Sequence, residues 1–182
     1  MTDVQTVRGA IPATGLGVTL MHEHVFVLSP EIMANYPEGG GDETAREQAA
    51  VDKLNALKAI GVDTIVDPTV IGLGRYIPRI QRVAQRTDVN IVVATGVYTY
   101  NDVPMYFHFS GPGTALDGPE PMVDMFVRDI TEGIADTGIK AAILKCATDE
   151  PGVTPGVERV LRAVAAAHRA TGVPITTHTH AN

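Results

Sequence analysis

The sequence predicts an α/β fold that is built on a parallel β-sheet. Five short apolar runs alternate with segments of helical periodicity along the chain. Runs that are apolar throughout are typical of parallel strands buried on both faces, and their alternation with helices indicates repeated β/α units. A doubly wound sheet and a β/α barrel both satisfy this pattern. No Gly-x-Gly-x-x-Gly follows a strand, which weakens the nucleotide-binding version, and polar residues at the C-terminal ends of several strands favour the barrel.

The first elements follow from local patterns. Residues 1–17 carry glycine and proline at turn positions and predict turns with short strand pairs. Residues 18–27 are apolar and rich in β-branched side chains, so they predict the first strand, and residues 28–43 are expected to form a loop. Thr44, with Glu47 three residues later, forms a capping box that begins a helix.

The same periodicities continue to the end of the chain. The remaining strands are expected at residues 62–67, 90–95, 139–145 and 173–178, with helices at 75–86, 122–138 and 154–172. Thr154 and Pro155 supply the cap and first turn of the last helix, and Gly172 ends it. Residues 96–118 are long for a βα connection and hold five aromatic residues, and long loops of this kind are usually functional.

The composition excludes several classes of function. The 182 residues are 45% hydrophobic and 19% charged, as in an ordinary soluble globular domain. The 14 Lys and Arg against 21 Asp and Glu give a net charge of −7, and without a basic run this argues against nucleic acid and anionic membranes as partners. The sequence shows no signal-peptide pattern and no membrane-spanning run. A single cysteine, Cys146, allows no internal disulfide, so we expect a cytoplasmic protein.

Two histidines on the first predicted strand, His22 and His24, are the first candidate site. Side chains two apart on a strand share a face, and two adjacent imidazoles can reach one metal ion through bonds of about 2.0–2.1 Å. The alternative is a pair of hydrogen-bonded core histidines. His178, at the end of the last predicted strand, would lie on the same barrel face and favours the metal.

Lys145 and Asp67 also lie at predicted strand ends. Lys145 follows an apolar run, where burial beside metal cations disfavours an ammonium ion. Either it pairs with a carboxylate or reaches water, or its amine is neutral and chemically modified. Asp67 either holds a ligand histidine from behind or caps the following turn. Cys146 is expected to be a small buried hydrophobe.

Several motifs resemble those of one known family. Residues 7–12 (Val-Arg-Gly-Ala-Ile-Pro) and 19–24 (Thr-Leu-Met-His-Glu-His) resemble the opening of the phosphotriesterase family in the amidohydrolase superfamily. Residues 141–147 (Ala-Ala-Ile-Leu-Lys-Cys-Ala) resemble its strand-four lysine segment, and residues 176–179 (Thr-Thr-His-Thr) its strand-five histidine segment. Residues 94–100 (Ala-Thr-Gly-Val-Tyr-Thr-Tyr) are similar to the branch of phosphotriesterase-like lactonases.

The resemblance implies a TIM-type (β/α)8 barrel, of which this chain covers about the first five β/α units, and a centre of two divalent metal ions. His22 and His24 would bind the more buried ion and His178 the second. Lys145, carboxylated by carbon dioxide, would bridge both ions as a carbamate. A bridging hydroxide would be the nucleophile, because metals lower the pKa of bound water. Zinc is the first expectation for the metal, with cobalt, manganese and iron as alternatives.

The resemblance also implies the substrate. Tyr98 would lie over the metals and orient a lactone oxygen, and Tyr98 and Tyr100 would bind the substrate beside an apolar pocket for an acyl chain. We therefore expect a hydrolase that opens lactones, such as N-acyl-homoserine lactones in quorum quenching, with promiscuous phosphotriesterase activity. A primary phosphotriesterase or another amidohydrolase is the alternative enzyme. We expect a homodimer with small-molecule substrates.

The family has further metal ligands on strands six and eight, whereas this sequence stops at Asn182, just after the fifth predicted strand. A β/α barrel typically needs about 250 residues. We therefore expect residues 1–182 to be the N-terminal portion of a single metal-dependent hydrolase barrel domain. A noncatalytic metal-binding fragment is the alternative from another class of function.

Overall fold

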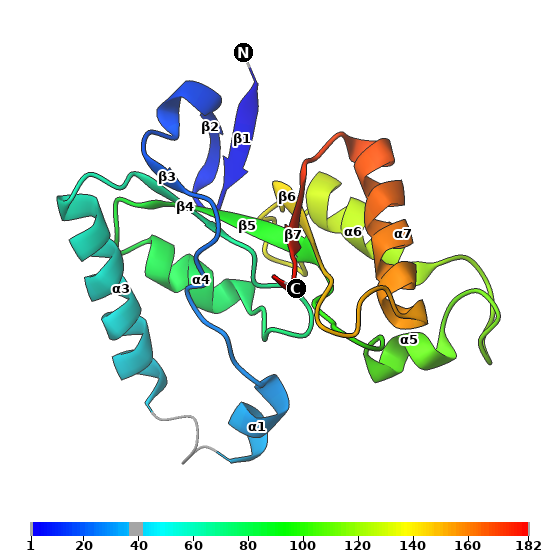
Figure 1. Cartoon of the computed structure of the whole chain (residues 1–182). Helices are drawn as coiled ribbons and strands as arrows, with labels where there is room; N and C mark the ends of the chain where they lie inside the picture. The colour runs from blue at the N-terminus through cyan, green and yellow to red at the C-terminus, as the bar shows by residue number, and fades with distance from the viewer. Residues whose placement is uncertain (1, 37–41, 182) are drawn as a thin grey trace.

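The chain forms two β-sheets, and helices pack against the larger one (Figure 1). A computed structural model describes residues 2–36 and 42–181. The small sheet is an antiparallel hairpin of β1 (Asp3–Thr6) and β2 (Gly9–Pro12), which confirms the predicted strand pair near the N-terminus. The large sheet contains β3 (Thr19–Leu20), β4 (Thr64–Asp67), β5 (Asn90–Gly96), β6 (Ile143–Ala147) and β7 (Ile175–His178).

The order of the strands distinguishes the two predicted architectures. The five strands of the large sheet are all parallel and lie side by side in chain order, β3-β4-β5-β6-β7. A doubly wound sheet reverses its strand order at a switch point, whereas a barrel adds each strand beside the previous one. The large sheet is therefore that of a partial β/α barrel.

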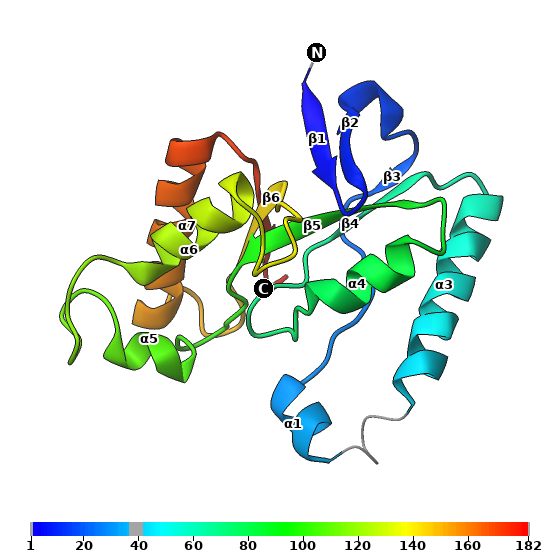
Figure 2. The ribbon, with the colours of Figure 1, turned by 180° about the vertical axis from the view of Figure 1, so that it is seen from behind.

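Helices connect these strands, and they form two groups, one along each half of the large sheet (Figures 1 and 2). The long connections hold α3 (Glu43–Ala59), α4 (Ile77–Ala84), α6 (Pro121–Thr131) and α7 (Pro155–Thr171). Three short elements lie in loops: the 3-10 helix η1 (Ala13–Gly15), α1 (Pro30–Asn35) and α5 (Met105–Phe109).

The buried side chains show which face of the sheet the helices cover. Ile65, Ile91 and Val93 pack with α3 and α4, and Leu144 and Cys146 pack with α6 and α7. The alternate positions form a separate cluster on the other face, which we call the inner face: Val66, Val92, Ala94 and Ile143. The helices thus lie on one side of the sheet, as in a barrel, and Cys146 is buried as expected.

The first strand is much shorter than predicted. We expected it over residues 18–27, but β3 covers only Thr19–Leu20. Beyond Leu20 the chain leaves the sheet, and the Phe26 ring lies 5.2 Å from the guanidinium carbon of Arg79 on α4. An apolar run that packs against a helix has the same composition as a buried strand, which is why the pattern misled.

Both ends of α7 were predicted well, whereas the start of α3 was not. Thr154 caps α7 and Gly172 ends it in the left-handed conformation with φ 75°, both as expected. The predicted cap of α3 at Thr44 is wrong, because the side chain of Asp42 accepts the amide of Thr44. The predicted partner of that cap, Glu47, pairs with Arg82 instead.

Two other connections differ from expectation. The helix predicted over residues 122–138 corresponds to α6, which ends at Thr131. The expected loop over residues 28–43 contains α1, and residues 37–41 of that loop lie outside the described part of the chain. Neither segment contains a candidate site residue.

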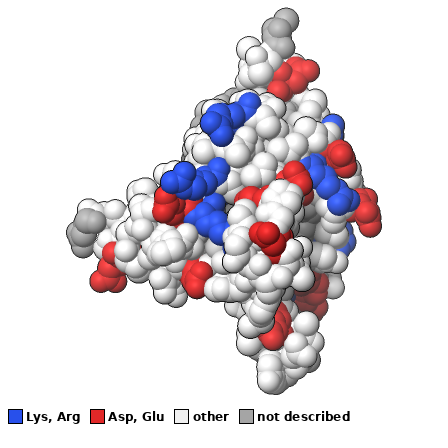
Figure 3. All heavy atoms as spheres, turned by 90° about the vertical axis from the view of Figure 1, so that its right-hand side faces the viewer, with Lys and Arg blue, Asp and Glu red and all other residues white. Residues whose placement is uncertain are grey.

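Acidic and basic side chains are interspersed on the face seen from the right-hand side of Figure 1 (Figure 3). Two arginines of α7 form ion pairs: Arg159 with Glu120, the N-cap of α6, and Arg162 with Glu158, one turn away on α7. In the part of the chain that the structure describes, no helix has the length and apolarity needed to cross a membrane.

Candidate metal centre

The predicted site residues gather where the parallel strands end. Lys145 lies on β6 beside Gly96 of β5, and His178, the last residue of β7, lies beside Ala147. Because Lys145 alternates with Leu144 and Cys146 on the helix side, it shares the inner face with Ile143. The strand ends thus bring the lysine and the histidine to one edge of the inner face.

Lys145 is a buried amine without an acidic partner. Its side chain is 1% exposed, and Nζ lies 3.5 Å from Nε2 of His22. Among the described residues no carboxylate forms an ion pair with it. Burial lowers the pKa of Lys145, because the charged form loses its hydration. Of the two alternatives left open by the sequence, the ion-paired lysine has no support here, and the neutral amine does.

His22 reaches the inner face by a route that the sequence did not predict. Leu20 packs on the helix side of the sheet, and on an uninterrupted strand His22 would follow it there. The chain bends after Leu20 instead, so that His22 meets Lys145 and its ring lies 5.2 Å from that of His24. Burial lowers the pKa of His22, and the charges of Lys145, His24 and His178 lower it further. A neutral imidazole is the form that binds metal ions.

Tyr98 and His178 form the other side of the site. Their ring centroids are 5.5 Å apart, and Nε2 of His178 lies 3.4 Å from Oδ2 of Asp149. Burial raises the pKa of Tyr98, and the nearby carboxylate of Asp149 raises it further. The amide of Glu150 donates to Asp149 and lowers the pKa of that carboxyl group. Tyr100 lies close enough to Tyr98 to affect its ionisation, and its side chain is exposed.

Sequence reasoning missed Asp149. The residue follows β6 by two positions, and polar residues just beyond strand ends are the ones that build the active face of a barrel. The strand was predicted to end at residue 145, so Asp149 lay too far beyond it to attract notice.

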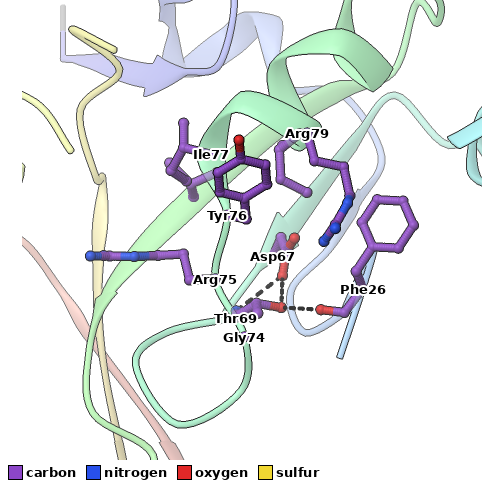
Figure 4. A pocket seen from close by; sticks show the side chains of 10 residues that line it. Phe26, Asp67, Thr69, Gly74, Arg75, Tyr76, Ile77 and Arg79 are labelled. Carbon is purple, nitrogen blue, oxygen red and sulfur yellow. Dashed lines mark hydrogen bonds between the residues drawn. The ribbon is translucent and has the colours of Figure 1, made fainter. Parts of the chain in front are cut away.

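Asp67 caps the turn after β4 through Thr69 (Figure 4), and the same threonine contacts His24. Its Oδ1 accepts the amide of Thr69 at 3.0 Å and the hydroxyl of Thr69 at 2.5 Å, which caps the turn after β4. Oγ1 of Thr69 lies 2.7 Å from Nδ1 of His24, and Oδ1 of Asp67 lies 3.7 Å from the same nitrogen. Asp67 therefore supports His24 through Thr69. The Asp-Pro-Thr sequence indicates the turn bond between Asp67 and Thr69, because an aspartate often bonds the backbone two residues on, but it does not indicate the contact of Thr69 with His24.

The donor set fits a metal ion only with the help of Lys145. Within residues 2–36 and 42–181, no three side chains of His, Cys, Asp or Glu converge as metal ligands on their own. His22 and His24 are adjacent imidazoles, a ligand type that suits zinc, iron and other transition metals. The buried Lys145 next to His22 is unfavourable as an ammonium ion, whereas an anionic derivative of its amine would complete the set.

Comparison with known proteins gives consistent matches. A sequence model of the phosphotriesterase family matches residues 2–182. The chain is 71% identical over 181 residues to a phosphotriesterase homology protein of Mycobacterium tuberculosis (strain ATCC 25618 / H37Rv), covering 100% of this chain and 56% of that protein. It is 42% identical over 176 residues to an aryldialkylphosphatase of Saccharolobus solfataricus, covering 96% of this chain and 53% of that protein.

A solved structure described as the phosphotriesterase from Mycobacterium tuberculosis superimposes with a TM-score of 0.96 at 71% identity. The superposition covers 99% of this chain and 56% of that one. The chain thus spans a little over half the length of the relatives that it matches.

Proposed function

The chain belongs to the phosphotriesterase family, and from this premise we propose that the protein is a metal-dependent hydrolase that opens lactones and also cleaves organophosphate triesters. We further propose that residues 1–182 are the N-terminal portion of one barrel domain. The partial barrel and the match to a little over half the length of the relatives support this. The homodimer and the cytoplasmic location expected from the sequence stay predictions.

The observation that carries the proposal is the buried amine of Lys145 beside His22, without an acidic partner among the described residues. Such an amine is ready for carboxylation, because only the neutral form reacts with carbon dioxide. We propose that His22, His24, His178 and carboxylated Lys145 hold two divalent cations, zinc first among them. Cations bound there would lower the pKa of water and polarise a carbonyl or phosphoryl oxygen.

The residues around this centre would bind and orient the substrate. Tyr98 lies against His178 with its hydroxyl group near Asp149, which suits it to donate a hydrogen bond to a substrate oxygen. The loop that follows presents exposed apolar side chains, among them Met105, Tyr106 and Phe109. These would contact an acyl chain, which supports a lactone with an aliphatic tail as the substrate.

The test is metal content and turnover in the protein as encoded by its gene. Lys145→Ala should lose metal and activity together, because the variant lacks the amine that would carry the bridging anion. A short carboxylic acid in the buffer should restore part of both, and Lys145→Glu should retain more metal than Lys145→Ala. Lys58→Ala is the matched control, since Lys58 forms a half-exposed ion pair with Asp63, and it should behave as wild type.

Two results would contradict the proposal. Full metal content in Lys145→Ala would exclude the lysine from the centre. Metal binding without turnover of an aliphatic lactone or an aryl dialkyl phosphate would support the alternative, a noncatalytic metal-binding protein. The ratio of the two turnover rates separates a lactonase from a primary phosphotriesterase.

A further inference from the structure

Thr69 lies between Asp67 and His24, and its hydroxyl group contacts both (Figure 4 shows its bonds to Asp67 and Phe26). The side chain is 6% exposed and belongs to the turn that follows β4. We propose that Thr69 is a positioning residue, whose hydroxyl group fixes His24 in the tautomer with the proton on Nδ1 and turns the Nε2 lone pair toward the site. The ligand role of that lone pair rests on the proposed function, whereas the tautomer does not.

The direction of each hydrogen bond follows from counting protons. The hydroxyl group of Thr69 has one proton and lies near Oδ1 of Asp67 at 2.5 Å, Nδ1 of His24 at 2.7 Å and the carbonyl oxygen of Phe26 at 3.3 Å. A carboxylate and a carbonyl oxygen only accept, so neither can supply a proton to Oγ1. The shortest contact identifies Oδ1 as the acceptor of the hydroxyl proton. Nδ1 of His24 must then donate to Oγ1.

The opposite assignment fails on the same distances. If Nδ1 of His24 accepted the hydroxyl proton, Oγ1 of Thr69 and Oδ1 of Asp67 would stand 2.5 Å apart with no proton between them. Protonating Asp67 would be the only remedy. An ionised carboxylate needs no such remedy, because it accepts both the amide of Thr69, at 3.0 Å, and the hydroxyl group of Thr69.

His24 needs this support because it lies outside the sheet. β3 ends at Leu20, four residues before His24. Next to His24, the amide of Glu23 still bonds the carbonyl group of Val66 on β4 at 3.0 Å, but the segment is not part of a strand. A side chain on such a segment lacks the orientation that a strand would impose. Asp67, by contrast, is 2% exposed at the end of β4, so it provides a fixed anchor for the chain of hydrogen bonds.

The consequence for metal binding has a known scale. Hydrogen-bonding partners behind a metal-bound histidine fix its tautomer and orientation, and their loss typically weakens metal affinity by about 10–100-fold. We expect Thr69→Val, which keeps the shape and removes the hydroxyl group, to weaken zinc affinity by about this factor. Thr69→Ser, which keeps the hydroxyl group, should restore most of the loss.

The direct test is the tautomer of His24 in the metal-free protein. Nitrogen-15 NMR of labelled histidine, with His24 assigned by substitution, should show the proton on Nδ1 in wild type and Thr69→Ser. In Thr69→Val the proton should move to Nε2 in part or in full. The matched control is Thr95→Val, because Thr95 is also buried and donates to Asp129 at 2.6 Å on the helix side of the sheet. It should leave both the His24 tautomer and zinc affinity unchanged.

The outcomes separate this inference from the proposed function. A proton on Nε2 of His24 in the metal-free wild type would overturn the inference and leave the hydrolase proposal standing. So would equal zinc affinity in Thr69→Val and wild type in buffer containing bicarbonate. A proton on Nδ1 together with a wild type that binds no divalent metal would instead contradict the proposed function while confirming the arrangement of Thr69. If Thr69→Val fails to fold, the wild-type spectrum and Thr69→Ser still decide the tautomer.

Discussion

The backbone of Gly96 lies directly against the carbonyl group of Lys145, with no space for a side chain between them. A Cβ atom at Gly96 would stand 1.9 Å from the carbonyl oxygen of Lys145. The two residues are also partners in the register of β5 and β6. This close approach fixes where the backbone of Lys145 lies within β6, and therefore where its buried amine points.

Gly96→Ala should damage the site from within the sheet. Gly96 has φ 144°, a conformation almost restricted to glycine, so the backbone alone costs about 1–3 kcal/mol. The overlap with Lys145 adds to this and should shift the lysine, so we expect both lower stability and lower metal content. Urea unfolding and elemental analysis measure the two effects. Gly15→Ala is the control, because a Cβ there meets no atom within 4 Å, and an unaffected Gly96→Ala would show that the strands can separate freely.

The sequence predicted the sheet and the inner-face residues for a physical reason. Continuous apolar runs identify strands that are covered on both faces. A polar residue at the end of such a run is easily recognised in the sequence. Lys145 and His178 were therefore found by pattern alone. The first strand was not, because Phe26 packs under Arg79 outside the sheet, and an apolar run does not record which surface it packs against.

Stability should depend on pH through Glu43, which joins α3 to α4. The hydrogen bond from Arg79, at 2.6 Å, lowers the pKa of Glu43 below its ordinary value of 4.5. The unfolded chain then takes up a proton before the folded chain does, so this stabilisation is complete above pH 4.5 and disappears as the pH falls through the lower folded value. Because Glu43 is 41% exposed and screened by water, we expect Glu43→Gln to lose no more than about 1 kcal/mol at pH 7.

The measurement is the free energy of unfolding of wild type and Glu43→Gln from pH 7 down to pH 3. The difference between them should shrink once the pH is below 4.5. Glu132→Gln is the control, since its ion pair with Arg128 spans 3.6 Å between side chains that are 73% and 64% exposed. A constant difference for Glu43→Gln across the whole range would show that the Arg79 bond contributes nothing to the pH dependence.

The long loop after β5 should depend on a single arginine of α7. Arg159 donates to the carbonyl groups of Phe107 at 2.5 Å and Ser110 at 2.6 Å, and it pairs with Glu120 at 2.6 Å. Arg159→Met would leave these acceptors unpaired, and we expect a loss of about 2–3 kcal/mol. Amide hydrogen exchange should accelerate across residues 104–120. Arg162→Met, three residues along, is the control with a 77% exposed side chain and should lose less than about 0.5 kcal/mol. Equal exchange in both variants would remove Arg159 as the anchor.

The parts of the site that the sequence did not predict share one property. Thr69 and Asp149 act on the candidate ligands through hydrogen bonds, and each lies in a turn just beyond a strand. Threonine and aspartate are common in turns for local reasons, so their presence there carries little information. Only the three-dimensional contacts with His24 and His178 distinguish these two from other turn residues.

Tyr98→Phe should separate substrate orientation from metal binding. The Tyr98 ring packs against His178, and phenylalanine keeps that contact while removing the hydroxyl group near Asp149. If the hydroxyl group donates one hydrogen bond to a lactone in the transition state, kcat/KM should fall roughly tenfold, or about 1.4 kcal/mol, with metal content and stability unchanged. Tyr76→Phe is the control, because Tyr76 is 52% exposed and its ring lies against the guanidinium group of Arg79. Wild-type lactone kinetics in Tyr98→Phe would exclude the hydroxyl group from catalysis, whereas a loss of metal would assign Tyr98 to the structure of the centre itself.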